Sequence, residues 1–156
     1  MPIDIRNWFR SAYMGEEEEM RVMLKESELT CLNARNDIGN TALHTAAREG
    51  HADVVRMLLL RHPQIAVNET NVYDETALHL AAERGHKDVV QLLLGYREKL
   101  DMNASDQFGC TALHLATREG HADVVEMLLG HPKIDVNAPN KQQNTALLEM
   151  EQQVKL

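Results

Sequence analysis

The chain has 156 residues, a length that suits one domain of ordinary size, and it carries a formal net charge of −8 with a pI near 5.4. An acidic surface repels a phosphate backbone, so this composition disfavours direct binding to nucleic acid. The longest apolar runs extend for only a few residues, and the two cysteines, Cys31 and Cys110, form no Cys-x-x-Cys motif. We therefore expect no membrane-spanning segment and no disulfide framework.

The N-terminal residues lack a basic region followed by an apolar stretch, which is the pattern of a secretory signal. Two cysteines without a framework are ordinary for a reducing compartment. These features favour a cytoplasmic or nuclear location.

A four-residue motif, Thr-Ala-Leu-His, recurs at nearly constant intervals along the chain. It begins at Thr41, Thr76 and Thr111, and a weaker copy, Thr-Ala-Leu-Leu, begins at Thr145, so the spacings are 35, 35 and 34 residues. A fixed period of this length is the signature of a repeat architecture. Each full copy is followed in step by Gly-His, Val-Val, Leu-Leu and an apolar-Asn pair: Gly50-His51, Gly85-His86 and Gly120-His121, then Val54-Val55, Val89-Val90 and Val124-Val125, then Leu58-Leu59, Leu93-Leu94 and Leu128-Leu129, then Val67-Asn68, Met102-Asn103 and Val136-Asn137.

This combination of motifs resembles the ankyrin repeat, with about a dozen matching positions in each of three units. The resemblance implies an all-α ankyrin-repeat solenoid, in which each unit is a helix–turn–helix with a β-hairpin loop. In such a stack each unit packs only on its neighbours, so no single round core is needed.

Residues 1–34 contain no copy of the motif, but they align with the first full repeat when they are shifted by 35 positions. Trp8 then falls under Leu43. We interpret residues 1–34 as a degenerate repeat that caps the N-terminal end, because a terminal unit faces water on one side. The acidic run at 16–19 is expected to open the second helix of this cap, near the positive end of the helix dipole. A docking patch for a basic partner is the alternative.

Residues 35–69 form the first full repeat, and its sequence indicates where the helices begin and end. Thr41 is a natural N-cap, because its hydroxyl can accept an N–H of the first turn. Gly50 can adopt the left-handed conformation that ends the inner helix. The outer helix then carries one apolar stripe at i, i+1, i+4 and i+5: Val54, Val55, Leu58 and Leu59.

Residues 70–104 and 105–138 repeat this scheme with one change in the hairpin loop. The glycine that the first and third repeats carry there is Asp74 in the second repeat and Gln143 in the last unit. Aspartate tolerates a left-handed conformation moderately well, whereas glutamine does so less readily. The sequence therefore predicts the second hairpin and leaves the last one open.

Residues 139–156 begin a fourth unit with Thr145, and no further glycine or Val-Val pair follows. Met150 and Glu151 replace the two alanines of the inner helix, and larger or polar residues suit a helix that faces the end of a stack. We interpret this segment as a half-repeat that caps the C-terminal end. A fragment of a longer array would look similar.

Six of the eight histidines occupy repeat-locked positions, which argues against a metal site. Equivalent histidines are one repeat apart, roughly 10 Å, whereas zinc–nitrogen bonds are about 2 Å long. The family resemblance implies that the histidine of each motif forms hydrogen bonds within its unit and to the next unit. We predict no metal ion or other cofactor for these residues: His44, His79, His114, His51, His86 and His121.

No nucleophile, base and orienting group recur in a catalytic pattern, and no glycine-rich phosphate loop is present. The sequence therefore predicts that the protein is not an enzyme and has no small-molecule substrate.

Recognition can differ at positions that vary between units, because stacking fixes the core positions. The residues three before each threonine are Ile38, Tyr73, Phe108 and Gln142, and the resemblance places them near the hairpin tips. Exposed apolar and aromatic side chains are enriched in protein interfaces, although these could instead fold back on adjacent hairpins. The hairpin residues that we predict to contact a partner are Ile38, Asn40, Val72, Tyr73, Glu75, Gln107, Phe108 and Cys110.

A second set of varying residues is expected to line the concave face of the stack. Arg84 and Arg118 can offer two parallel hydrogen bonds to a carboxylate, although surface ion pairs of this kind are equally consistent with simple solvation. The concave residues that we predict to contact a partner are Arg48, Glu49, Glu83, Arg84, Arg118 and Glu119.

The sequence therefore predicts a cap, three full ankyrin repeats and a terminal half-repeat. The predicted function is that of a monomeric, non-catalytic adaptor, scaffold or inhibitor that binds a protein partner. The alternative is an ankyrin segment of a larger regulatory protein or enzyme that positions another domain. The resemblance also suggests that Asn68, Asn103 and Asn137 match positions that an asparaginyl hydroxylase modifies in some ankyrin proteins.

Overall fold

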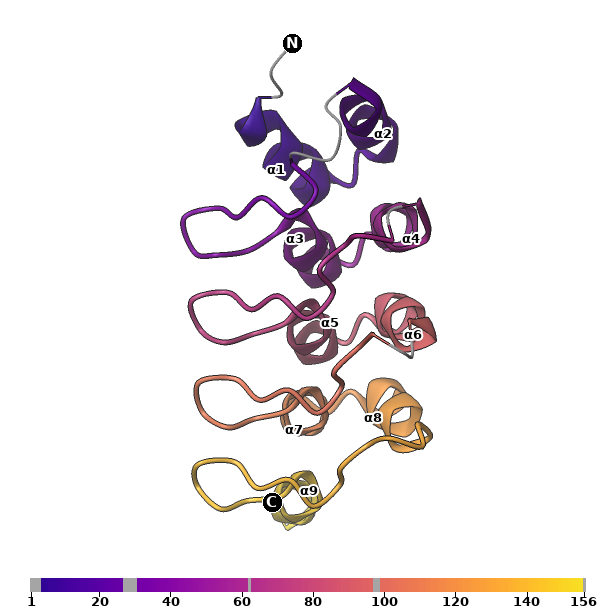
Figure 1. Ribbon diagram of the computed structural model, residues 1–156. Coiled ribbons are helices and arrows are strands. Elements are labelled where there is room, and N and C mark those ends of the chain that lie inside the picture. The colour runs from indigo at the N-terminus through magenta and orange to yellow at the C-terminus, as the bar shows by residue number, and fades with distance from the viewer. Residues whose placement is uncertain (1–3, 27–30, 62, 97–98, 156) are drawn as a thin grey trace.

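The chain folds into a stack of helix pairs, as the computed structural model shows for residues 4–26, 31–61, 63–96 and 99–155 (Figure 1). The described residues contain helices and loops and no β-strand, so the all-α class predicted from the sequence is confirmed. None of the described helices is long and apolar enough to cross a membrane. The helices are α1 (Ile5–Met14), α2 (Glu17–Glu26), α3 (Ala42–Glu49), α4 (Ala52–Arg61), α5 (Ala77–Arg84), α6 (Lys87–Gly95), α7 (Ala112–Arg118), α8 (Ala122–Leu129) and α9 (Ala146–Val154).

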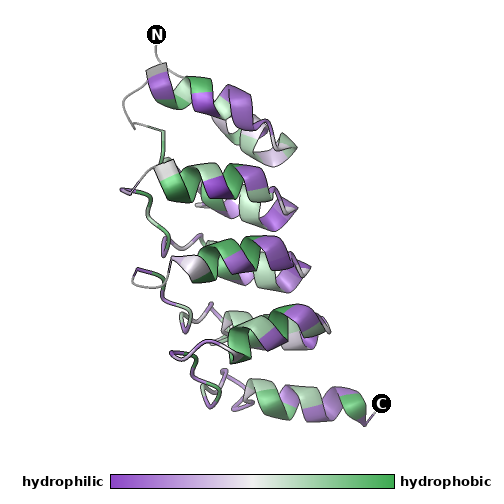
Figure 2. Cartoon of the chain, turned by 90° about the vertical axis from the view of Figure 1, so that its right-hand side faces the viewer, coloured by the Kyte–Doolittle hydropathy of each residue, from purple (hydrophilic) through white to green (hydrophobic). Residues whose placement is uncertain are grey.

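The helices form two columns. The inner column contains α1, α3, α5, α7 and α9, and the outer column contains α2, α4, α6 and α8 (Figure 1). Loops project from the inner column on the side away from the outer helices, and the two ends of the chain lie at opposite ends of the stack. The view turned by 90° shows the helix pairs as successive layers (Figure 2). The residue boundaries given above for the repeats stay a prediction.

The inner helices α3, α5, α7 and α9 begin at the predicted threonines, and each of the three full motifs forms a capping box. The side chain of Thr41 accepts the backbone N–H of His44. In return, Nδ1 of His44 accepts the backbone N–H of Thr41, at 3.1 Å. Thr76 with His79 and Thr111 with His114 repeat this arrangement. A capping box usually has Glu or Gln at this position, so histidine here replaces a carboxylate or an amide.

The inner helices α1, α3 and α5 end in tight turns whose glycines leave no room for a side chain. Gly85 has φ +72°, and a Cβ placed there would lie 2.5 Å from Nδ1 of His121. That histidine is the N-cap of α8 in the following unit, and its Nε2 donates to the carbonyl of Glu83 at 2.8 Å. The small glycine therefore allows the imidazole to bind the end of the preceding inner helix.

The N-terminal helix pair packs on the stack as the shifted alignment predicts. Trp8 and Met20 are fully buried, and α1 packs on α3 while α2 packs on α4. The second helix begins at Glu17, inside the acidic run, and Oγ of Ser11 lies 3.1 Å from a carboxylate oxygen of Glu16. At least part of the acidic run thus has a structural role.

Candidate interaction surface

The hairpin loops are linked tip to tip by their own backbones. The N–H of Val72 donates to the carbonyl of Ile38, that of Gln107 to Tyr73, and that of Lys141 to Phe108, at 2.9 to 3.0 Å. Four loops that are separate in sequence are thereby joined into one continuous edge. We call five residues of this edge the hairpin row: Ile38, Val72, Tyr73, Gln107 and Phe108.

Within each loop, one Asn or Asp side chain holds the backbone in shape. Oδ1 of Asp106 accepts the N–H groups of both Phe108 and Cys110, at 2.8 and 2.9 Å. Such a side chain mimics a backbone turn, so it stabilises the loop from within. The sequence analysis missed this set, although its members recur at the repeat period: Asn36, Asn71, Asp106 and Asn140.

The last hairpin, which the sequence left open, has the same form as the others. Gln143 adopts φ +63° and Asp74 adopts φ +60°, both in the left-handed region. Asn140 forms backbone hydrogen bonds with Gln143 and Asn144, both at 2.9 Å. Its side chain adds two more, so the local network holds glutamine in a conformation that favours glycine.

The apolar side chains of the hairpin row face solvent. Ile38, Tyr73 and Phe108 are 38%, 45% and 61% exposed, and Val72 is also exposed, while Gln107 is half-buried. These side chains are therefore available to a partner and are not folded away between neighbouring loops.

Three predicted contact residues that precede the threonines are not on this surface. Asn40 and Cys110 are buried, and Glu75 is half-buried. Oδ1 of Asn40 and the carboxylate of Glu75 both accept from Nδ2 of Asn71, at 3.0 and 2.8 Å. Asn40 and Cys110 lie beside the N-cap and turn into the stack, and their contact with a partner stays a prediction.

Cys110 contacts Arg118, one of the residues predicted on the concave face. The guanidinium of Arg118 donates to Sγ of Cys110 at 3.0 Å. Burial raises the pKa of the Cys110 thiol, and the Arg118 hydrogen bond opposes this only in part. The thiol is therefore a packing group with little thiolate character at neutral pH.

The charged pairs on the inner helices differ in how far they reach solvent. Arg48, Arg84, Arg118 and Glu119 are exposed, whereas Glu49 and Glu83 are half-buried. Of these, Arg118 has the best-defined environment, because it bonds Cys110 and lies 4.0 Å from a carboxylate oxygen of Glu149.

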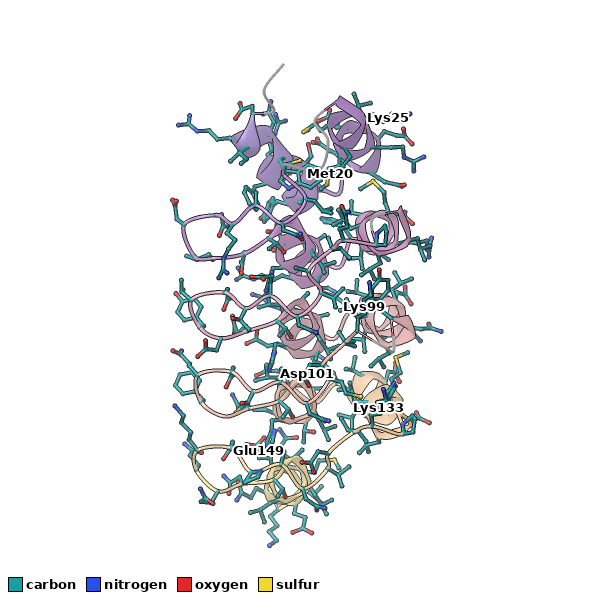
Figure 3. All side chains as sticks on the ribbon, viewed as in Figure 1. Met20, Lys25, Lys99, Asp101, Lys133 and Glu149 are labelled. Atoms are coloured by element: carbon teal, nitrogen blue, oxygen red, sulfur yellow. The ribbon has the colours of Figure 1, made fainter. Side chains whose placement is uncertain are left out.

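A pocket of about 350 Å³ joins the hairpin row to the concave face. Arg118 and Glu149 line it together with Phe108. Figure 3 shows Glu149 beside the last hairpin loop, on α9. Its Oε1 accepts from Asn140 at 2.8 Å, while its Oε2 is buried without a hydrogen-bond partner.

The sequence analysis did not identify Glu149 or Lys141, which also lines this pocket. The available signal was the departure from the repeat. Glu149 stands where the earlier units have Thr45, Leu80 and Leu115. A larger pocket, about 650 Å³, lies between α6 and α8 on the convex side and contains none of the predicted contact residues.

The repeat-locked histidines have structural contacts. Nε2 of His44, His79 and His114 lies 3.0 Å from the carbonyls of Glu75, Cys110 and Asn144 in the next loop. Burial lowers the pKa of His44 and of His79, although the hydrogen bonds to these carbonyls oppose the shift. No group of His, Cys, Asp and Glu within the described ranges could hold a metal ion.

The asparagines of the apolar-Asn pairs clamp one unit to the next. Asn103 donates to the carbonyl of Lys133 and accepts the N–H of Asp135, both at 2.8 Å. Asn68 bonds Lys99 and Asp101 in the same way, and Figure 3 labels both partners. Hydroxylation of these asparagines stays a hypothesis.

Comparison with protein families gives two matches. A family model described as "Ankyrin repeats (3 copies)" matches residues 62–140, and a model described as "Ankyrin repeat" matches residues 38–72. The first match alone covers just over half of the chain. A comparison with curated proteins gives no match.

Proposed function

Because the chain belongs to the ankyrin repeat family, whose members are generally protein–protein interaction modules, we propose that it binds a protein partner through the hairpin row and the adjoining concave face. It acts without catalysis, as an adaptor, scaffold or inhibitor, and it does so as a monomer.

The observation that carries this proposal is the exposure of Ile38, Tyr73 and Phe108 on loops that are already hydrogen-bonded to one another. Exposed aromatic side chains provide large contact areas in protein interfaces. The backbone bonds hold the loops in place before binding, so little conformational entropy remains to be lost.

The two ends of the hairpin row carry opposite charges, which would fix the orientation of a bound partner segment. Asp37 lies beside the apolar tip of the first hairpin, and Lys141 lies at the corresponding position of the last one. A partner segment with apolar residues in its centre, a basic end near Asp37 and an acidic end near Lys141 would complement this distribution.

The pocket between Phe108 and Arg118 fits the acidic end of such a segment. The Arg118 side chain remains 47% exposed and lies 4.0 Å from Glu149, so its guanidinium can still bind a carboxylate of a partner.

The test is affinity capture from cell lysate, followed by binding measurements with the purified captured protein. The native chain is compared with a Tyr73→Ala/Phe108→Ala variant. The control is Tyr13→Ala/Leu60→Ala, which removes two exposed side chains from α1 and α4. We expect the first variant to lose about tenfold or more in affinity and the control to bind like the native chain.

Circular dichroism checks that all three chains remain folded. Equal binding by the native chain and the Tyr73→Ala/Phe108→Ala variant would contradict the assignment of the hairpin row. Failure of the native chain to capture any discrete protein would favour an ankyrin segment that positions another domain.

A further inference from the structure

The last layer of the stack exposes an apolar groove on the side of the outer helices. Two adjoining pockets of about 250 and 360 Å³ share Thr117, Val125, Leu129 and Met150. Among the described residues that line these pockets, Glu126 alone is charged. Figure 1 shows no outer helix beside α9, whereas every earlier inner helix has one. We call this surface the C-terminal groove and define it by Val125, Leu129, Val136, Leu147 and Met150.

Positions that are buried in earlier repeats are open in this groove. Leu43, Leu78 and Leu113 are at most 2% exposed, but Leu147 in the same repeat position is 60% exposed. Val67 and Met102 correspond to Val136, which is 40% exposed, and Leu59 corresponds to Leu129, which is 45% exposed. The groove therefore presents a surface that an outer helix and its loop cover elsewhere in the stack.

An asparagine on the rim of the groove also indicates that the groove suits an outer helix and its loop. In earlier units, the amides of Asn33, Asn68 and Asn103 each bond the loop that follows the next outer helix. Asn137 has the same repeat position and lines the groove. No described residue forms a hydrogen bond with its side-chain amide, so one donor pair and one acceptor remain for a further loop.

The last unit lacks the glycine turn that follows the earlier inner helices. The inner helices α1, α3, α5 and α7 are each followed by a glycine in the left-handed region: Gly15, Gly50, Gly85 and Gly120. Val154 has this position in the last unit, and α9 continues through it to Lys155, where φ is −79°.

Gln153 also occupies the backbone carbonyl that a residue after such a turn binds in the earlier layers. Its Nε2 donates to the carbonyl of Arg118 at 2.5 Å. In earlier layers, the corresponding carbonyl is bound by the histidine that follows the glycine turn of the next unit. His86 binds Arg48 in this way, and His121 binds Glu83. In the last layer a glutamine side chain thus binds the carbonyl that a histidine binds in the earlier layers.

We propose that the C-terminal groove binds an amphipathic helix of a partner protein, with apolar residues at i, i+1, i+4 and i+5 and a basic residue opposite Glu126. The apolar pattern is that of α4, where Val54, Val55 and Leu58 are fully buried. An apolar groove of this kind recognises one face of a helix through such regularly spaced anchors.

The choice of a basic residue follows from the packing of the outer helices. Arg56, Gln91 and Glu126 have the same position in successive outer helices. Gln91 and Glu126 line one pocket between α6 and α8, so the equivalent residue of a helix docked beside α8 would face Glu126. Arginine at that point would place opposite charges across the groove.

A labelled peptide with the sequence of residues 50–68 is a suitable probe, because it carries this apolar stripe, Arg56 and the following loop. Fluorescence anisotropy with the full chain should show saturable binding. Leu129→Asp and Leu147→Asp should each weaken it by about tenfold or more, because a charge would enter the apolar contact. Both side chains are exposed, so the fold should tolerate these changes, and circular dichroism verifies this.

Leu60→Asp is the matched control, because Leu60 is an exposed leucine on α4, away from the groove. It should leave the affinity within about twofold. Glu126→Lys should weaken binding of the native peptide, and a peptide with Arg56→Glu should recover affinity for that variant. Recovery would locate the contact, because each single change alone places like charges together.

Three outcomes would overturn the proposal. They are no saturable binding up to about 1 mM peptide, equal weakening by Leu60→Asp, and a concentration-dependent dimer of the native chain that Leu129→Asp abolishes. The last result would assign the groove to a second copy of this chain. Tyr73→Ala/Phe108→Ala should leave peptide binding unchanged, which separates this site from the hairpin row.

Discussion

At the scale of single residues, the motif histidines link two units through their two ring nitrogens. Nδ1 of His79 accepts the N–H of Thr76, so it carries no proton, and Nε2 therefore donates to the carbonyl of Cys110. This arrangement requires the neutral ring. A second proton on Nδ1 would face the Thr76 N–H and break the capping box.

We therefore expect stability to fall in mild acid. The pKa values of His44 and His79 are lowered in the folded state, mainly by burial, so the unfolded chain binds more protons as the pH drops. The stabilising contribution is complete above the ordinary histidine pKa of 6.5 and is lost as the pH falls from there through the lower folded-state pKa values.

Urea unfolding at pH 7.5 and 5.5 measures this effect. A His44→Gln/His79→Gln variant should be less stable than the native chain at pH 7.5, by about 1–3 kcal/mol for each disrupted buried site. It should lose less stability than the native chain between the two pH values. An identical loss in both proteins would contradict this assignment of the titrating groups.

At the scale of helices and loops, a repeated sequence position has different surroundings in different layers. Gly85 and Gly120 have φ values of +72° and +75°, so both need a left-handed residue. A Cβ at Gly85 would overlap the ring of His121, but a Cβ at Gly120 would meet no atom within 4 Å. The same substitution can thus separate backbone strain from steric overlap.

Gly120→Ala should cost about 1–2 kcal/mol of unfolding free energy, which is the strain of a left-handed alanine. Gly85→Ala should cost more, because the His121 ring must also move and release the Glu83 carbonyl. Urea unfolding of both variants gives the comparison. Equal losses would show that the imidazole adapts without a penalty.

The sequence predicted these elements well where a local signal sets them. The threonine caps, the glycine turns and the apolar stripes depend on residues within one unit, and the structure has them at the expected positions. The burial of Asn40 and Cys110 depends on contacts with Asn71 and Arg118. Asn71 belongs to the unit after that of Asn40, so one unit read alone cannot show the first contact. The second contact joins a hairpin loop to α7 within one unit, and it depends on how the two pack together.

Two further features depend on single residues of the last unit. The bond of Gln153 to Arg118 is possible because α9 includes Val154, at the position of the usual glycine. The pocket at Glu149 exists because a carboxylate replaces an apolar residue at one step of the repeat. Both residues depart from the repeat, but the repeat pattern does not show which contacts the new side chains form.

At the scale of the whole molecule, cohesion is a sum of contacts between successive layers. The layers in the middle are covered on both sides, whereas α9 packs mainly on α7. Leu147 and Leu148 are exposed on α9, while the corresponding Leu78 and His79 of α5 are buried. The C-terminal layer should therefore open most easily.

Native-state hydrogen exchange tests this gradient. Backbone amides of α9 should exchange through local opening at a lower free energy than those of α5, which should require opening of most of the stack. Gln153→Ala should speed exchange in α9 and leave α5 unchanged, because the bond to Arg118 is confined to the last layer. Uniform protection along the stack would contradict a layered opening.

The acceptors of the motif histidines allow the units to be interchanged. His44, His79 and His114 all bind a main-chain carbonyl, although the residues that supply it are Glu75, Cys110 and Asn144. A carbonyl is present whatever the side chain, so this junction places no demand on the identity of that residue. The order of the units could be permuted, or one could be duplicated, and the junction would reform. The residues of the recognition surface can therefore change in one unit at a time, while the histidine–carbonyl hydrogen bonds between the units stay the same.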